Sequence, residues 1–231
     1  MLCSSFESSM FRRTCTLGLL LLVTVYALKL IIVGFQNLDL SEFKPVAAVF
    51  LLDVSASNRN LLAEQEQTIL KISKRLDSED QALVYVVTED TYSVYNGNPH
   101  KLVAMREAIK KRGAFDEKSF GTAYGLALKK AVGDALRYKQ DGYKPAIIIL
   151  GDLENEGDIT KQINWSTLPK NIQKTLKYVP DLTLAFLYAH PQKLDDVRHS
   201  LLPVIKEKNL IVASEENVDQ AVRKILEAVG R

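Results

Sequence analysis

The fold is decided by a short stretch near residue 50, Val49-Phe50-Leu51-Leu52-Asp53-Val54-Ser55-Ala56-Ser57. Its apolar half, together with Ala48, is typical of a buried strand. A carboxylate and two hydroxyls follow at a spacing of two residues, in the pattern Asp-x-Ser-x-Ser. Such oxygen ligands suit a hard cation like Mg²⁺, but one carboxylate and two hydroxyls leave it under-coordinated. Taken alone, the pattern is equally consistent with a loop that caps a helix N-terminus.

Two later stretches supply further oxygen ligands. Ser119-Phe120-Gly121-Thr122 puts a hydroxyl at the start of a predicted helix, and the apolar stretch 145–151 is a second buried strand that is followed by Asp152. Ligands of open α/β sheets bind outside the carboxyl ends of the strands. Asp53 and Asp152 are both predicted at such ends, so we expect them to contribute to one site.

Together these residues resemble the metal-ion-dependent adhesion site of the von Willebrand factor A (vWA) domain family. The resemblance covers roughly residues 46–231, and its ligands match, in family order, Asp53, Ser55, Ser57, Thr122 and Asp152. It implies a doubly wound α/β fold with a mostly parallel six-stranded sheet, one antiparallel edge strand and helices on both faces.

The resemblance also implies how the site works. Ser55 and Ser57 bind Mg²⁺ (or Mn²⁺) directly, whereas Asp53, Asp152 and Thr122 bind it directly or through water. The remaining coordination position takes an Asp or Glu carboxylate from a partner protein. Such a site binds rather than catalyses, because its ligands include no general base positioned over an activated water.

Composition narrows the class of protein. A length of 231 residues is enough for one domain plus an appendage. The net charge of +2 and the scattered lysines, with no basic stripe among aromatics, argue against nucleic-acid binding. The only cysteines, Cys3 and Cys15, precede the predicted domain, which therefore has no thiol or disulfide.

The N-terminal region carries a predicted membrane segment. Residues 14–35 are long and apolar enough to cross a bilayer as a helix, although Lys29 interrupts them and must snorkel to the interface. We favour an uncleaved signal anchor; the alternative is a signal peptide cleaved after Ala27. Arg12 and Arg13 precede the segment, and they favour a cytoplasmic N-terminus and an extracytoplasmic domain.

This interpretation gives a single-pass membrane protein with four parts. They are a cytoplasmic tail at 1–13, the membrane segment at 14–35, a linker at 36–45 and the vWA domain at 46–231. Within the domain, predicted strands and helices alternate, as in a parallel sheet covered on both faces. Strands are expected at 46–53, 82–88, 91–95, 145–151, 182–188 and 210–213, and helices at 60–76, 102–109, 122–138, 194–206 and 218–229. The stretch 152–180 has the least regular pattern.

That irregular stretch begins with an acidic loop, 152–158. It resembles the start of a calcium-binding loop, but Glu stands at two positions that need Asp or Asn, and Ile163 stands at the closing position. We expect a solvated loop that makes the potential near the metal site more negative. Glu154, Glu156 and Trp165 form a possible partner-binding rim; alternatively, Trp165 packs its own loop.

The sequence bears on three classes of function. The predicted function is a membrane-anchored, divalent-metal-dependent protein-binding module. The alternative is a structural or assembly subunit of an envelope complex in which the metal site is vestigial or only stabilising. An aspartyl-phosphate hydrolase would need a second acid two residues after Asp53, where Ser55 stands, so we predict that the protein is not an enzyme.

Overall fold

The computed structural model describes Thr24, Lys29 and residues 44–112, 121–154 and 157–231. The chain divides into two compact units, Met1–Phe43 and Lys44–Arg231. The predicted tail, membrane segment and most of the linker lie almost wholly outside the described residues. Within the part that is described, no helix is both long enough and apolar enough to cross a bilayer. The anchor therefore stays a prediction, and the fold described below is that of the second unit.

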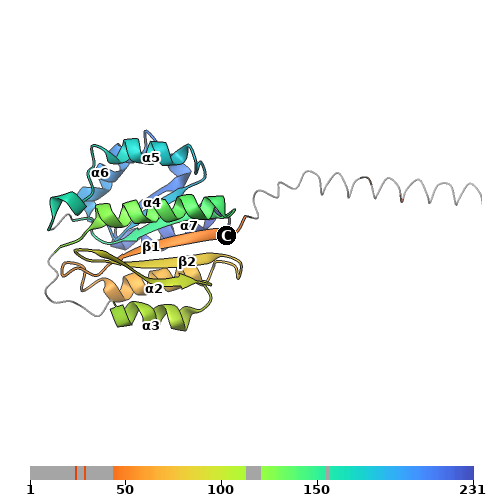
Figure 1. Cartoon of the computed structure of the whole chain (residues 1–231), viewed down its shortest axis with the longest axis horizontal. Helices are drawn as coiled ribbons and strands as arrows, with labels where there is room; N and C mark the ends of the chain where they lie inside the picture. Colours follow the sequence, from red (N-terminus) through yellow and green to blue (C-terminus); the bar gives the residue numbers. More distant parts are fainter. Residues whose placement is uncertain (1–23, 25–28, 30–43, 113–120, 155–156) are drawn as a thin grey trace, which may run out of the picture. The chain divides into compact units, whose positions relative to one another are not determined.

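A six-stranded sheet forms the centre of the unit Lys44–Arg231, in the order β3-β2-β1-β4-β5-β6 (Figure 1). Five strands are parallel, and β3 at one edge runs antiparallel to β2. This confirms the predicted mixed sheet. The strands are β1 (Val46–Asp53), β2 (Gln81–Val87), β3 (Thr91–Gly97), β4 (Lys144–Leu150), β5 (Thr183–Leu187) and β6 (Leu210–Ala213).

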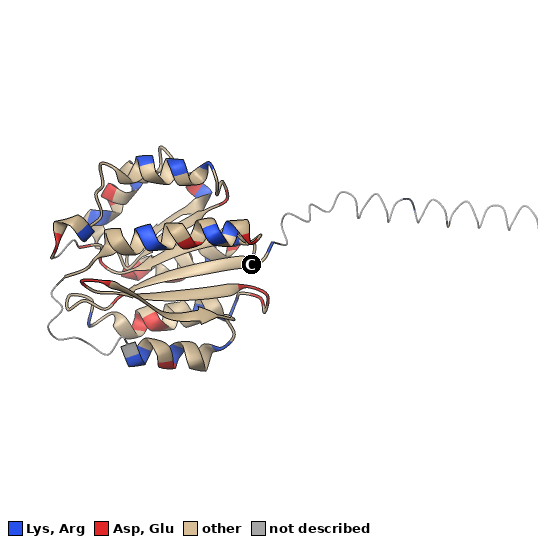
Figure 2. Cartoon of the chain, viewed as in Figure 1, with Lys and Arg blue, Asp and Glu red and all other residues tan. Residues whose placement is uncertain are grey.

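Helices cover both faces of this sheet and create two apolar cores. One core lies under α2 (Leu62–Ser73), α3 (Leu102–Arg112) and α7 (Val218–Val229). The other lies under α4 (Tyr124–Gln140), α5 (Leu168–Leu176) and α6 (Pro191–Leu201). Alternate residues of β1 enter opposite cores, so the whole strand is buried and its sequence is continuously apolar up to Asp53. The charged residues lie mostly on helices and loops, and the strands are largely uncharged (Figure 2).

The stretch 152–180 is more regular than the sequence indicated. It contains the short 3₁₀ helix η2 (Ile159–Lys161) and helix α5. The buried side of α5 consists of only three side chains, Leu168, Ile172 and Thr175, at spacings of four and three residues. This spacing is helical, so the pattern was present in the sequence. It was missed because the helix is only nine residues long and follows an irregular stretch.

The end of the chain closes the domain through a buried ion pair. The Arg231 guanidinium donates to both oxygens of Asp80, at 2.9 and 2.6 Å, and lies 3.1 Å from Asp77. Asp80 is fully buried, and its carboxylate also accepts from the backbone N–H of Val46 at 2.7 Å. One carboxylate thus joins the start of β1, the turn before β2 and the last residue.

We expect Arg231→Ala to lower the free energy of unfolding by about 3 kcal/mol, because it leaves the buried Asp80 carboxylate without its cation. Urea denaturation of the full chain in detergent measures the loss. The control is Arg223→Ala on the exposed side of α7, which should change stability by no more than about 0.5 kcal/mol. Equal effects of the two substitutions would show that the ion pair is not important for stability.

Candidate metal centre

The five predicted ligands come from three segments that meet at the carboxyl ends of β1 and β4. Asp53 ends β1, Asp152 follows β4 by two residues, and Thr122 precedes α4 by two. β1 and β4 are neighbouring parallel strands, so their ends lie side by side. The chain passes from β1 to β2 and β3 on one side and then returns to β4 on the other, so the site lies where the strand order reverses. This is where open α/β sheets bind their ligands.

The loop after β1 brings two hydroxyls together. Asp53 Oδ1 accepts from the backbone N–H of Ser55 at 2.8 Å, and this bond folds the loop back on the strand. The Oγ atoms of Ser55 and Ser57 are then 3.1 Å apart. Adjacent ligands of an octahedral Mg²⁺ ion, with bonds of about 2.1 Å, lie about 3 Å apart. The two hydroxyls are therefore spaced as two ligands of one small cation would be.

A single tyrosine hydroxyl joins the three segments. Tyr124 is almost completely buried, and its hydroxyl donates to Asp53 Oδ2 and accepts from the backbone N–H of Leu153 at 3.3 Å. Tyr124 stands two residues after Thr122, and Leu153 follows Asp152 directly. The hydroxyl thus fixes all the ligand-bearing segments relative to the Asp53 carboxylate.

The close approach of these segments requires a glycine before Asp152. A Cβ atom on Gly151 would lie 2.0 Å from the Tyr124 hydroxyl oxygen and 2.7 Å from the Cβ of Asp53. The next bend is at Leu153, which is buried and has a φ of 63°, in the left-handed region that a bulky residue seldom adopts. The burial of its side chain and its bond to Tyr124 hold this conformation.

Buried amides complete the support of Asp53. Asn58 Nδ2 donates to Asp53 Oδ2, and Gln65 Nε2 donates to Asn58 Oδ1 at 3.2 Å. All three side chains are buried. Gln65 Oε1 has no hydrogen-bond partner among the residues described. The network supplies several hydrogen-bond donors to the Asp53 carboxylate but no positive charge.

The electrostatics of Asp53 favour a cation. Burial raises its pKa to about 6, against the hydrogen bonds from Tyr124 and Ser55, which lower it; the charge of Asp152 raises it further. The folded state therefore holds this proton more tightly than the unfolded chain, and ionisation between about pH 4 and 6 costs stability. Within the described residues, no Lys or Arg forms an ion pair with Asp53. A bound cation would supply the missing charge.

The donor set fits a small hard cation. No group of three or more His, Cys, Asp or Glu residues positioned for a metal occurs in the ranges that the structure covers. The predicted site has only two such residues and takes its other oxygens from three hydroxyls. Asp53, Ser55 and Thr122 are buried, Asp152 is half-buried and Ser57 is exposed, so the site opens to solvent on one side.

The predicted rim residues differ in their surroundings. Glu154 is exposed, and its backbone N–H donates to Asp152 Oδ1 at 2.8 Å, so it lies next to the ligands. Trp165 is half-buried against the core under α4, α5 and α6, and it therefore contributes to packing. Glu156 lies outside the described residues. A role of these three residues in partner binding stays a prediction.

In the described part of the acidic loop, the Asp158 carboxylate has local hydrogen-bond partners. Asp158 Oδ1 accepts from the backbone N–H and the hydroxyl of Thr160, at 2.9 and 2.7 Å, and these bonds lower its pKa. The carboxylate therefore caps η2.

Sequence reasoning did not identify Tyr124, Asn58 or Gly151. A role for Asn58 was indicated in part by the sequence, because it is a polar residue in the same short loop as the motif. Gly151 directly precedes a predicted ligand, which is a common place for a close backbone approach. Nothing in the sequence indicated a role for Tyr124, because its partner Asp53 is 71 residues away along the chain.

Several solved structures share the fold of this chain. BatB from Bacteroides thetaiotaomicron is 15% identical, covers 80% of this chain and 100% of its own, and has a TM-score of 0.54. The SpRpn10 VWA domain is 11% identical, with coverage of 78% and 95% and a TM-score of 0.58. No family model matches the sequence, and no curated protein matches it.

A third similar structure is proximal thread matrix protein 1 from the mussel byssus, described with a zinc-occupied MIDAS motif. It is 14% identical over 79% of this chain and has a TM-score of 0.51; the chain spans 46% of its length. The fold is that of a von Willebrand factor A domain. The vWA fold predicted from the Asp-x-Ser-x-Ser pattern is therefore confirmed, whereas identities this low carry no function across.

Two glycine substitutions test the geometry of the site. We expect Gly151→Ala to lower the free energy of unfolding by about 3 kcal/mol or more, because the new methyl group overlaps Tyr124 and Asp53. Gly133→Ala is the matched control: it lies within α4 with nothing within 4 Å of a new Cβ, and should add about 0.5–1 kcal/mol. Chemical denaturation measures both, and a tolerated Gly151→Ala would refute the close approach.

Proposed function

We propose that this chain is a divalent-metal-dependent protein-binding module. The cation is Mg²⁺ or Mn²⁺, and its ligands are Asp53, Ser55, Ser57, Thr122 and Asp152. The observation that carries the proposal is the Tyr124 hydroxyl, which ties the three ligand-bearing segments to one buried carboxylate. The 3.1 Å spacing of the two serine hydroxyls supports a small ion. The zinc-occupied motif of the mussel protein supports a divalent cation.

The hydrogen bonds of Asp53 suggest how the site attracts a partner. A carboxylate has about four lone-pair positions. Three are used by the donors of Ser55, Asn58 and Tyr124. One position is left, so Asp53 would bind the metal through a single lone pair, directly or through water. The direct ligands are then largely neutral hydroxyls.

A cation with weak neutral ligands stays strongly attractive to an anion. When bound, it acts as a Lewis acid that accepts one further oxygen. We infer that this oxygen belongs to an Asp or Glu of a partner protein, whose charge the ion neutralises. The residues of the site hold and orient the ion, so the role that we propose is binding and not catalysis.

We also propose that residues 14–35 anchor the module in a membrane as a single pass. The N-terminus would be cytoplasmic and the vWA domain extracytoplasmic. The support is the apolar length of the segment and the two arginines before it. The partners are then a protein that presents a carboxylate and the membrane itself, with no nucleic acid.

Metal binding should stabilise the folded chain. At about a hundred times its dissociation constant, Mg²⁺ should add about 2.7 kcal/mol, which a rise in the thermal midpoint reports. Ser55→Ala and Thr122→Ala should reduce this rise, because each removes one oxygen ligand. Glu154→Ala, on an exposed neighbour of Asp152, is the control and should keep it. A midpoint indifferent to Mg²⁺, Mn²⁺ and chelator would favour a vestigial site.

The same variants test partner binding. Cross-linking of the full chain in its own membranes should capture the partner with Mg²⁺ present and fail with chelator or with Ser55→Ala. Capture that persists in chelator would show that the partner binds elsewhere, even if the metal stabilises the domain.

The topology has its own test. A reporter that is active only outside the cytoplasm should work when fused after residue 45, and the protein should fractionate with membranes. Cleavage after Ala27 would instead release the domain into the soluble fraction. Activity of a cytoplasm-only reporter at the same position would reverse the proposed orientation.

A further inference from the structure

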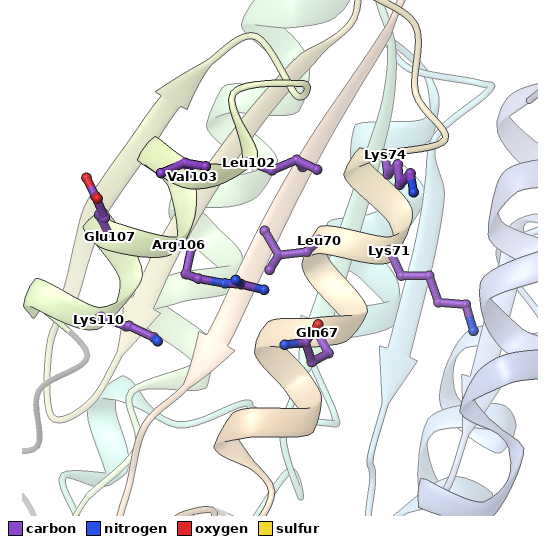
Figure 3. Close-up of a pocket in the computed structure, with 9 residues that line it drawn as sticks. All are labelled: Gln67, Leu70, Lys71, Lys74, Leu102, Val103, Arg106, Glu107 and Lys110. Carbon is purple, nitrogen blue, oxygen red and sulfur yellow. The ribbon is translucent and has the colours of Figure 1, made fainter.

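A groove of about 720 Å³ lies between α2 and α3. It is lined by Gln67, Leu70, Lys71, Lys74, Leu102, Val103, Arg106, Glu107 and Lys110 (Figure 3). The metal-site loop leads into the N-terminal end of α2, whereas the groove is lined by the later turns of that helix. It is therefore a surface separate from the predicted ligands.

The floor of the groove is apolar. Leu102 points from α3 toward α2, and Leu70 points back toward α3 (Figure 3). Val103, beside Leu102, is an apolar side chain with 72% of its surface exposed. These three residues provide a surface on which a partner's apolar side chain can be buried.

The edges of the groove are basic. Lys71, Lys74, Arg106 and Lys110 contribute four positive charges and Glu107 one negative charge, a net of +3 for the lining residues. Asp219 and Glu66, the ion-pair partners of Lys71 and Arg106, reduce this to +1. The remaining positive charge attracts an anionic ligand.

Two of the four cations have no anion of their own. Lys71 pairs with Asp219 at 2.5 Å, and Arg106 pairs with Glu66 at 3.1 Å. Lys74 and Lys110 form no ion pair with any residue in 44–112, 121–154 or 157–231. They stand toward opposite ends of the groove (Figure 3).

We propose that this groove binds an acidic amphipathic helix of a partner protein. The apolar face of the helix packs on Leu70, Leu102 and Val103, and its carboxylates pair with Lys74 and Lys110. From residue 67 to 74 the groove is two helical turns long, about 10 Å, which suits a bound segment of two to three turns. A bilayer surface is flat and would contact the helix crests, whereas a single helix can enter the hollow between them.

The test uses the full chain in detergent and a fluorescein-labelled helical peptide of Leu, Glu and Ala, about four turns long, with one apolar and one acidic face. Fluorescence anisotropy should show saturable binding that weakens with salt. Lys74→Glu/Lys110→Glu should weaken it about tenfold, and Val103→Ser about threefold. The control is Lys170→Glu/Lys177→Glu, which makes the same charge change at exposed positions at α5, on the opposite face of the sheet.

Equal weakening by the groove and α5 pairs would overturn the proposal, because binding would then follow net charge alone. If Val103→Ser left the affinity for the peptide unchanged, the apolar contact at Val103 would be refuted. Vesicles with phosphatidylserine that bind the chain through Lys74 and Lys110, with no binding of the peptide, would show a membrane surface instead. Chelator should have no effect: loss of peptide binding in chelator would place the peptide at the metal site and refute the groove without touching the proposed function.

Discussion

The Asp53 carboxylate, which is buried with hydrogen-bond donors and has no counter-ion among the described residues, is the constraint on which the site depends. Burial of an ionised group is costly unless it is paired. Here Ser55, Asn58 and Tyr124 donate to it, and none of them neutralises it. Burial accordingly raises the pKa of Asp53 to about 6. The domain therefore carries an electrostatic cost that a cation outside the strand end would remove.

Other unusual features of the site follow from holding that carboxylate in place. Tyr124 reaches Asp53 only because Gly151 has no side chain between them. The same hydroxyl accepts a hydrogen bond from the backbone N–H of Leu153, which helps to hold that residue in a left-handed conformation. Strain of this kind is found where the surrounding structure requires one backbone path. Here the path places Asp152 beside the end of β1.

The sequence revealed the parts of this arrangement that are local and left out those that are not. Buried parallel strands read as apolar runs, so β1 and β4 and the residues that follow them were predictable. The predicted ligands came from the family pattern. The distant support of Asp53 was not predictable, because Tyr124 reaches Asp53, and Leu153 reaches Tyr124, only in the folded chain. Helix α5 was missed for a different reason: its buried positions follow a helical period, but the helix is only nine residues long and follows an irregular stretch. The charges of the groove were visible on α2 and α3 separately, but their juxtaposition needed the tertiary structure.

The two surfaces would respond to different conditions. A carboxylate held by a cation depends on the metal and on an ionised Asp53. A helix held by Lys74 and Lys110 depends on ionic strength, because exposed charges are screened over about 8–10 Å at physiological salt. A partner that bound both surfaces would gain affinity, because after the first contact forms the second becomes intramolecular. Neither contact would need to be strong by itself. Helix α2 follows the loop of the predicted metal site and lines the groove with its later turns, so it fixes the separation of the two surfaces. Only a partner with its acidic helix and its carboxylate at matching distance would obtain that gain. Specificity would then come from geometry, although each contact alone recognises little more than a negative charge.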